Sequence, residues 1–201
     1  MGYFSTKIFT VALLLTTRFV FTVQARQCSD GQYLHGSSCL NCTPGLYYQT
    51  TATEIDNIKC DRCPPGKYSS ESSSLSCNNC TTGTFSFGVG EAYCQNCAVG
   101  KYQSETGGHF CSKCNPGMYA DITGIGVCKQ CRLGLYQQEF GRLSCKQCPI
   151  GYHSFMKVSG LRLRGSSCNT CKKGRYGDTI AATNSSFCKN CSIGRYSTII
   201  G

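Results

Sequence analysis

Cys97-Ala98-Val99-Gly100-Lys101-Tyr102 is the stretch that decides the fold, because most of the chain repeats its pattern. The pattern, C-x-x-G-x-[Tyr/Phe], begins at Cys28, Cys42, Cys63, Cys80, Cys97, Cys114, Cys131, Cys171 and Cys191, and in an altered form at Cys148, where His153 replaces the aromatic residue. C-x-x-C pairs recur every 17 residues in the central part, starting at Cys60, Cys77, Cys94, Cys111, Cys128 and Cys145. A fixed period of this kind indicates a tandem repeat, in which each unit packs mainly on its neighbours.

The composition excludes a single large hydrophobic core. The chain has 201 residues with 19 cysteines and no tryptophan, and Leu, Ile, Val and Phe are sparse after the N-terminal segment. Such a high cysteine content is typical of a scaffold held by disulfides. We therefore expect a small disulfide-rich fold, namely an extended tandem array of short β-hairpin-like modules with little helix outside the signal peptide.

Residues 1–25 have the features of a secretory signal peptide. Lys7 precedes the apolar run Ile8–Leu15, and the small residue Ala25 stands at the cleavage position. Arg18 divides the apolar segment into pieces too short to span a bilayer, and an uncleaved anchor is the alternative. Secretion brings the cysteines into an oxidising compartment, where they form disulfides. We predict a secreted protein or one on the extracellular side of the cell surface.

Loop lengths predict how the cysteines pair. The repeats differ in length only between one C-x-x-C pair and the next, so each such stretch is interpreted as a loop closed on itself. This pairing also explains why Cys28 stands alone at the front. The predicted bridges are Cys28–Cys39, Cys42–Cys60, Cys63–Cys77, Cys80–Cys94, Cys97–Cys111, Cys114–Cys128, Cys131–Cys145, Cys148–Cys168 and Cys171–Cys188. The alternative, pairing within each C-x-x-C, makes a small strained ring and leaves Cys28 without a partner.

The predicted organisation is a signal peptide at 1–25, nine disulfide-closed repeats at 26–190 and the start of a truncated tenth repeat at 191–201. Cys191 opens a loop like the others, but no later cysteine closes it. We expect Cys191 to be free or to pair with another molecule, since an odd cysteine in a secreted chain has these two outcomes. Membrane association is then expected only through a missing C-terminal part or an uncleaved signal.

Each repeat has a glycine three residues after its opening cysteine and, in most repeats, an aromatic residue two positions later. Glycine there indicates a positive φ or a close approach of the chain, and the ring is expected to cover a disulfide or the neighbouring unit. Turn-forming residues such as Gly107 and Asn184 stand four positions before the closing cysteine, with His35 and Arg164 as exceptions. The aromatic residues just before closing cysteines are expected to pack on the stack: Tyr93, Phe110 and Phe187.

The chain resembles the ephrin-receptor-like cysteine-rich repeat and, more broadly, the cysteine-rich modules of growth-factor receptors and tumour necrosis factor receptors. The residues that carry the resemblance are Cys63-Pro64-Pro65-Gly66-Lys67-Tyr68, Cys77 and Cys80, and the same pattern repeats from Cys28 to Tyr196. It implies a secreted or cell-surface protein whose repeats contact ligands or act as spacers in a larger ectodomain, with pairing of the Cys63–Cys77 type. One module type runs throughout, so no specific tumour necrosis factor-like or ephrin-like ligand is implied. Cysteine-rich surface proteins of protists are also similar.

The sequence favours a non-enzymatic protein for extracellular recognition, adhesion or structural spacing, without a cofactor or metal. A zinc-binding array is one alternative, because successive C-x-x-C pairs have zinc-site spacing. A disulfide-exchange oxidoreductase is another, because C-x-x-C is a redox motif. The signal peptide disfavours zinc, and many copies without helical periodicity disfavour the oxidoreductase. The histidines share no spacing with a nucleophile or an acid and are expected to be exposed loop residues: His35, His109 and His153.

Positive charge is concentrated towards the C-terminal end. The formal net charge of +10 becomes +8 without Lys7 and Arg18 of the signal segment, and much of the surplus lies between Arg142 and Arg175. Such a surface attracts polyanions, for example an acidic glycan or a lipid headgroup surface, and a solvated basic face is the alternative. The partner is expected to be an extracellular protein or glycan, not nucleic acid. The candidate polyanion contacts are Arg162, Arg164, Lys172 and Lys173.

Four N-glycosylation sequons occur in the chain, and they predict a glycoprotein. Three of them have a cysteine of the repeat pattern at the middle position, which restricts access to the asparagine. Asn184-Ser185-Ser186 lacks this restriction and stands at a predicted turn tip, so we predict the glycan at Asn184.

Overall fold

The computed structural model describes residues 28–49, 60–154 and 165–196. The predicted signal peptide and two of the candidate polyanion contacts, Arg162 and Arg164, lie outside these residues.

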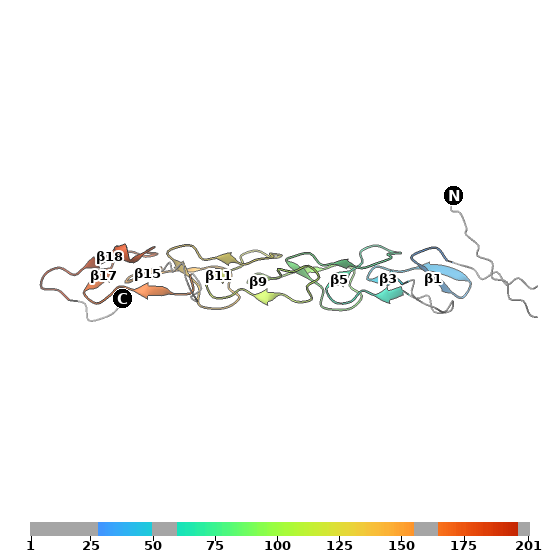
Figure 1. The fold of residues 1–201 in the computed structure, drawn as a ribbon, viewed down its shortest axis with the longest axis horizontal. Coiled ribbons are helices and arrows are strands. Elements are labelled where there is room, and N and C mark those ends of the chain that lie inside the picture. Colours follow the sequence, from blue (N-terminus) through green and yellow to red (C-terminus); the bar gives the residue numbers. More distant parts are fainter. Residues whose placement is uncertain (1–27, 50–59, 155–164, 197–201) are drawn as a thin grey trace, which may run out of the picture. The chain divides into compact units, whose positions relative to one another are not determined.

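Short antiparallel hairpins make up almost all of the regular structure in the described residues, as the ribbon in Figure 1 shows. The paired strands are β1 (Gln32–His35) with β2 (Ser38–Asn41), β3 (Leu46–Tyr48) with β4 (Cys60–Arg62), β5 (Lys67–Tyr68) with β6 (Asn78–Asn79), β7 (Thr84–Phe85) with β8 (Gln95–Asn96), β9 (Lys101–Tyr102) with β10 (Ser112–Lys113), β11 (Met118–Tyr119) with β12 (Lys129–Gln130), β13 (Leu135–Tyr136) with β14 (Lys146–Gln147), β15 (Tyr152–Ser154) with β16 (Cys168–Thr170), and β17 (Arg175–Gly177) with β18 (Cys188–Asn190). The one helical element in these residues is the 3-10 helix η1 (Ser185–Phe187). This arrangement confirms the predicted disulfide-rich array of short hairpins with little helix.

A disulfide closes the base of each hairpin. In chain order they join Cys28 to Cys39, Cys42 to Cys60, Cys63 to Cys77, Cys80 to Cys94, Cys97 to Cys111, Cys114 to Cys128, Cys131 to Cys145, Cys148 to Cys168 and Cys171 to Cys188. We number the segments that they close loops 1 to 9. The Cα atoms of Cys97 and Cys111 are 5.7 Å apart, which is an ordinary separation for a disulfide.

The chain divides into two compact units. One consists of Met1–Pro64, Tyr68–Asn78 and Gly88–Tyr93, and the other of Pro65–Lys67, Asn79–Phe87 and Cys94–Gly201. The segment Gly88–Tyr93 of loop 4 belongs to the first unit. It is held there by the Gly90 amide, which donates a hydrogen bond to the Cys63 carbonyl at 2.8 Å.

Within the second unit, backbone hydrogen bonds join successive loops in a repeating pattern. The Gly100 amide of loop 5 donates to the Ala120 carbonyl of loop 6 at 2.9 Å, and the Cys114 amide of loop 6 donates back to the Gly100 carbonyl at 2.9 Å. Loop 7 adds to the pattern, because the Gly141 amide donates to the Cys114 carbonyl at 2.8 Å. Polar backbone groups that the short strands leave unpaired are therefore satisfied by the neighbouring loops.

The glycine of the repeat pattern is required for two reasons, and Gly100 shows both. Its φ is +77°, in a region that residues with a Cβ atom rarely adopt. A Cβ atom at Gly100 would also lie 2.1 Å from the carbonyl oxygen of Gly141, two loops further along the chain. The close approach therefore joins loop 5 to loop 7, as well as to its neighbour, loop 6.

Half-cystines take the place of a hydrophobic core. Most of the buried apolar residues in the described part of the chain are cysteines in disulfides. One small cluster contains Cys114, Ala120 and Cys128 of loop 6, with Tyr102 of loop 5 packed against it. This confirms, for Tyr102, that the aromatic residue of one repeat covers the disulfide of the next.

Candidate binding site

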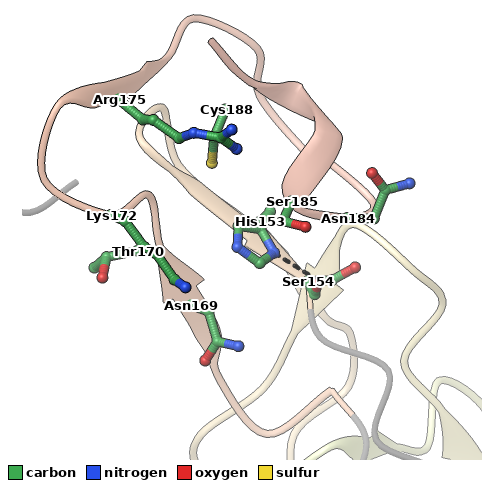
Figure 2. A pocket seen from close by; sticks show the side chains of 9 residues that line it. All are labelled: His153, Ser154, Asn169, Thr170, Lys172, Arg175, Asn184, Ser185 and Cys188. Carbon is green, nitrogen blue, oxygen red and sulfur yellow. Dashed lines mark hydrogen bonds between the residues drawn. The ribbon is translucent and has the colours of Figure 1, made fainter. Parts of the chain in front are cut away.

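A cavity of about 830 Å³ lies at loops 8 and 9, in the second unit. Figure 2 shows the residues that line it, which come from β15, β16, the start of loop 9 with β17, and the segment that runs through η1 into β18. They are His153, Ser154, Asn169, Thr170, Lys172, Arg175, Asn184, Ser185 and Cys188. Eight of these nine residues have polar side chains, so the cavity can hydrogen-bond to a ligand from several directions.

Strand β15 positions His153 and Ser154 at the cavity. His153 is opposite Asn169 in the hairpin register and forms a parallel bridge with Ala182 of loop 9. These two neighbours bury His153 to 9% exposure, and Ser154 is 5% exposed. The expectation that His153 is an exposed loop residue is therefore wrong, because the contact with loop 9 has no local signal in the sequence.

Ser154 departs from the hydrogen-bond pattern of the other loops. In loops 6 and 7 the corresponding carbonyls, of Ala120 and Gln137, accept from a glycine amide of the preceding loop. In loop 8 the Gly134 amide instead donates to the Ser154 hydroxyl, at 2.8 Å, and this hydroxyl donates to the Thr183 carbonyl at 2.9 Å. The side chain of Ser154 thus links loops 7, 8 and 9, with its hydroxyl proton committed to the Thr183 carbonyl.

The Ser154 carbonyl oxygen forms a hydrogen bond with His153, whose Nδ1 lies 3.0 Å away (Figure 2). A carbonyl oxygen only accepts hydrogen bonds, so Nδ1 must carry the proton. In the neutral ring Nε2 then has a free lone pair. No hydrogen bond to another described residue occupies Nε2, so it can serve a ligand in the cavity.

The two charged residues that line the cavity, Lys172 and Arg175, are both cationic. Neither forms an ion pair with a described residue. The nearby carboxylate of Asp178 is bound to Lys189, at 2.6 Å, and this hydrogen bond lowers the pKa of Asp178. The cavity therefore has a positive potential that no acidic lining residue cancels.

Part of the basic stretch is neutralised upstream of the cavity. Arg142 pairs with Glu139, and Lys146 lies 3.7 Å from the same carboxylate. The pKa of Glu139 is lowered chiefly because Arg142 donates hydrogen bonds to it. Glu139 lies at the edge of the stretch in the sequence, and sequence reasoning did not find these pairs because they form across a turn.

The remaining predicted site residues are distributed around the cavity or away from it. Lys173 is exposed and does not line the cavity. Asn184 is exposed and lines the cavity, where it caps η1 by accepting a hydrogen bond from the Ser186 amide at 2.9 Å. It does not occupy the left-handed turn position of loop 9, which belongs to Ala181 at φ +56°. Cys191 is half-buried and has no disulfide partner among the described residues.

Tyr93 and Phe110 do not pack on the stack as expected. Tyr93 is 66% exposed and Phe110 is 52% exposed. Phe187 is also exposed.

The disulfides argue against the zinc-binding alternative. Zinc binds cysteine as the thiolate, and Cys191 is the one cysteine outside a disulfide in the described residues. These residues also contain no cluster of three or more His, Cys, Asp or Glu side chains placed to hold a metal ion. None of their helices is long and apolar enough to cross a membrane.

Known proteins with similar repeats match the central part of the chain. The family described as tyrosine-protein kinase ephrin type A/B receptor-like matches residues 83–126 and 117–158. These residues are similar to ephrin-receptor-like cysteine-rich repeats, in agreement with the resemblance carried by residues 63–80.

Members of the tumour necrosis factor receptor superfamily are similar over shorter stretches. Member 11B from Rattus norvegicus is 41% identical over 24% of this chain and 13% of its own length. Member 5 from Sus scrofa is 38% identical over 23% of this chain and 19% of its own. Member 6B from Homo sapiens is 38% identical over 25% of this chain and 18% of its own. The chain thus spans less than a fifth of the length of these relatives, and the shared part is the cysteine-rich repeat.

Proposed function

We propose that this chain is a non-enzymatic, secreted or cell-surface protein whose repeats recognise or adhere to another extracellular molecule, or act as a spacer in a larger ectodomain. The observation that carries the proposal is the construction of the array. Disulfides and backbone hydrogen bonds form the scaffold, so the loop side chains are left free for contacts. The similarity to receptor ectodomain repeats supports an extracellular role.

Exposed apolar side chains in the loops support recognition of a protein. In the second unit, Phe110, Ile122, Val127 and Phe140 are all more than half exposed. Aromatic residues such as Phe110 and Phe140 are enriched at protein interfaces, where a few buried anchor residues contribute most of the binding energy. Phe110 and Val127 share one repeat position, directly before the closing cysteine, and Ile122 and Phe140 lie elsewhere in their loops.

The test begins with the oxidised chain, secreted and purified without reductant. Labelled protein is applied to intact cells and to extracellular matrix, and a reduced and alkylated sample is the control. We expect saturable binding that the control loses, because the loops present their side chains only while the bridges are intact. Binding that is equal in both samples would contradict recognition by the folded array.

Two further measurements separate this proposal from the alternatives. Mass spectrometry and metal analysis of the purified chain are expected to give nine disulfides and no bound zinc. An insulin-reduction assay is expected to give no turnover. Stoichiometric zinc, or catalytic reduction of insulin, would replace the recognition role with the corresponding alternative.

A further inference from the structure

We infer that the cavity at loops 8 and 9 is a binding site for an acidic saccharide, in which Lys172 and Arg175 bind a sulfate or carboxylate group. This inference deepens the recognition role proposed above and rests on it. It starts from the one repeat in which His153 replaces the aromatic residue.

The substitution explains why a cavity exists at this place. In loop 5, Tyr102 packs against Cys114 and Cys128 of loop 6. His153 has the same position in loop 8, five residues after the opening cysteine, and it lies with Cys188 of loop 9 along the cavity wall. Imidazole is smaller than the phenol ring of tyrosine, so the space beside the disulfide of loop 9 is left open and is lined by a polar ring.

The lining selects a polar and negatively charged ligand. Small-molecule sites are usually lined mainly by apolar side chains, but here Cys188 is the single residue without a polar side chain. Amides and hydroxyls, from Asn169, Thr170 and Ser185, offer the donors and acceptors that sugar hydroxyls need. Lys172 and Arg175 add two cations without an acidic neighbour in the lining, and Arg can bind a sulfate or carboxylate through two parallel hydrogen bonds.

The same lining disfavours an acidic peptide. Peptides usually anchor apolar side chains in a groove or add a strand to an exposed sheet edge. Among the described lining residues only Cys188 lacks a polar side chain, so the cavity has no apolar side-chain subsite for an anchor residue, and β16 (Cys168–Thr170) is only three residues long. A saccharide needs neither feature, and a cavity of about 830 Å³ lies within the range of small-ligand sites.

Three variants of the full chain test the site, produced in a bacterial periplasm so that disulfides form and no N-glycan occupies Asn184. Lys172→Ala removes a cation of the lining. Lys173→Ala is the matched control, because it removes the same charge from an exposed neighbour that does not line the cavity. His153→Tyr restores the aromatic residue of the other repeats and fills the space. Peptide mapping of the disulfides checks that each variant is folded.

The probes are a heparin-derived tetrasaccharide, which carries sulfate, a hyaluronan tetrasaccharide, which carries carboxylates alone, and a hexaglutamate peptide. Titration calorimetry is done at about 0.15 M salt, where charges more than about 8 Å apart are largely screened. Heparin carries carboxylates as well as sulfate, so binding of both saccharides would identify a carboxylate, and binding of the heparin fragment alone would identify a sulfate. We expect at least one saccharide to bind, at one site per chain. Lys172→Ala is expected to lower its affinity roughly tenfold, as for a lost charge-assisted hydrogen bond, Lys173→Ala less than about twofold, and His153→Tyr to abolish binding.

Three results would overturn the inference: no binding of either saccharide, equal losses in the Lys172 and Lys173 variants, or stronger binding of the peptide than of both sugars. The lysine pair decides the question even if His153→Tyr does not fold. Failure here is distinguishable from failure of the recognition role, because binding to cells through the exposed apolar loop residues does not require the cavity.

Discussion

Replacing Gly100 with alanine tests whether contacts between alternate loops hold the array together. Two costs are expected. The positive φ of Gly100, +77°, costs an alanine roughly 1–2 kcal/mol. The new Cβ atom would lie 2.1 Å from the Gly141 carbonyl oxygen, whereas ordinary contacts begin at 3.4 Å. Loop 7 must then move by more than about 1 Å, and overpacking of this kind costs roughly 1–3 kcal/mol.

The structure provides a control with the first cost and without the second. Gly174 has a φ of +76°, but a Cβ atom there would meet no atom within 4 Å. Gly174→Ala should therefore lower the free energy of unfolding by roughly 1–2 kcal/mol. Gly100→Ala should lower it by roughly 3–5 kcal/mol, since displacement of loop 7 also weakens the hydrogen bonds that Gly100 and Gly141 make with loop 6.

Both variants are compared by urea unfolding with the disulfides intact, followed by tyrosine fluorescence. Repeat arrays can unfold in stages, so hydrogen exchange at the Gly141 amide gives a local measurement as well. This amide donates to Cys114 and should exchange faster in Gly100→Ala while staying protected in Gly174→Ala. Equal destabilisation by the two substitutions would refute the reasoning, because backbone strain alone would then account for both.

Three further predictions follow from the bridges and the ion pairs. Replacing Cys97 and Cys111 together by alanine should cost about 3 kcal/mol in urea unfolding, the value for a loop of about 15 residues; no change in the midpoint would mean that the neighbouring loops constrain loop 5 without its bridge. Lys129 donates a hydrogen bond to Asp121 at 2.9 Å and so lowers the pKa of this carboxyl group. In an NMR titration, Lys129→Ala should therefore raise the pKa of Asp121. Any stabilisation of the fold by the pair should be present above the ordinary aspartate pKa and lost as the pH falls through the lowered pKa. Under non-reducing conditions an alkylating reagent should label Cys191, or the chain should run as a dimer that Cys191→Ser abolishes, and a Cys191 bridged within the monomer would contradict the proposed cysteine pairing.

The repeat period of the sequence was sufficient to predict the hairpins because each hairpin forms between residues of a single repeat. A cysteine, a glycine three residues later and an aromatic residue two further on recur in loop after loop, and each hairpin forms within its own loop. For Gly100 the sequence predicted a positive φ or a close approach. It could not show that both hold, because Gly141 is two loops away and nothing in the pattern records the packing order.

The cavity was not predictable for the same reason. His153 appeared as an altered copy of the pattern, and its burial depends on Ala182 in the next loop. Loop 9 is also longer than the central loops, with a sequence separation of 17 between its bridged cysteines instead of 14. This shifts the left-handed position from Asn184 to Ala181. Variation in loop length is therefore the signal that could have directed attention to loops 8 and 9.

The bridge at the base of each hairpin also decides how the protein responds to a pulling force. A pull along the chain is carried across the disulfide, so the residues inside a loop cannot be drawn out. For loop 5 the load crosses 5.7 Å between the Cα atoms of the bridged cysteines. It then follows the three residue steps from Cys111 to Cys114, which reach about 10 Å when extended. A reduced repeat of 17 residues would instead reach about 58 Å. Reduction of a single bridge would therefore increase the greatest length of the chain under load by about 40 Å.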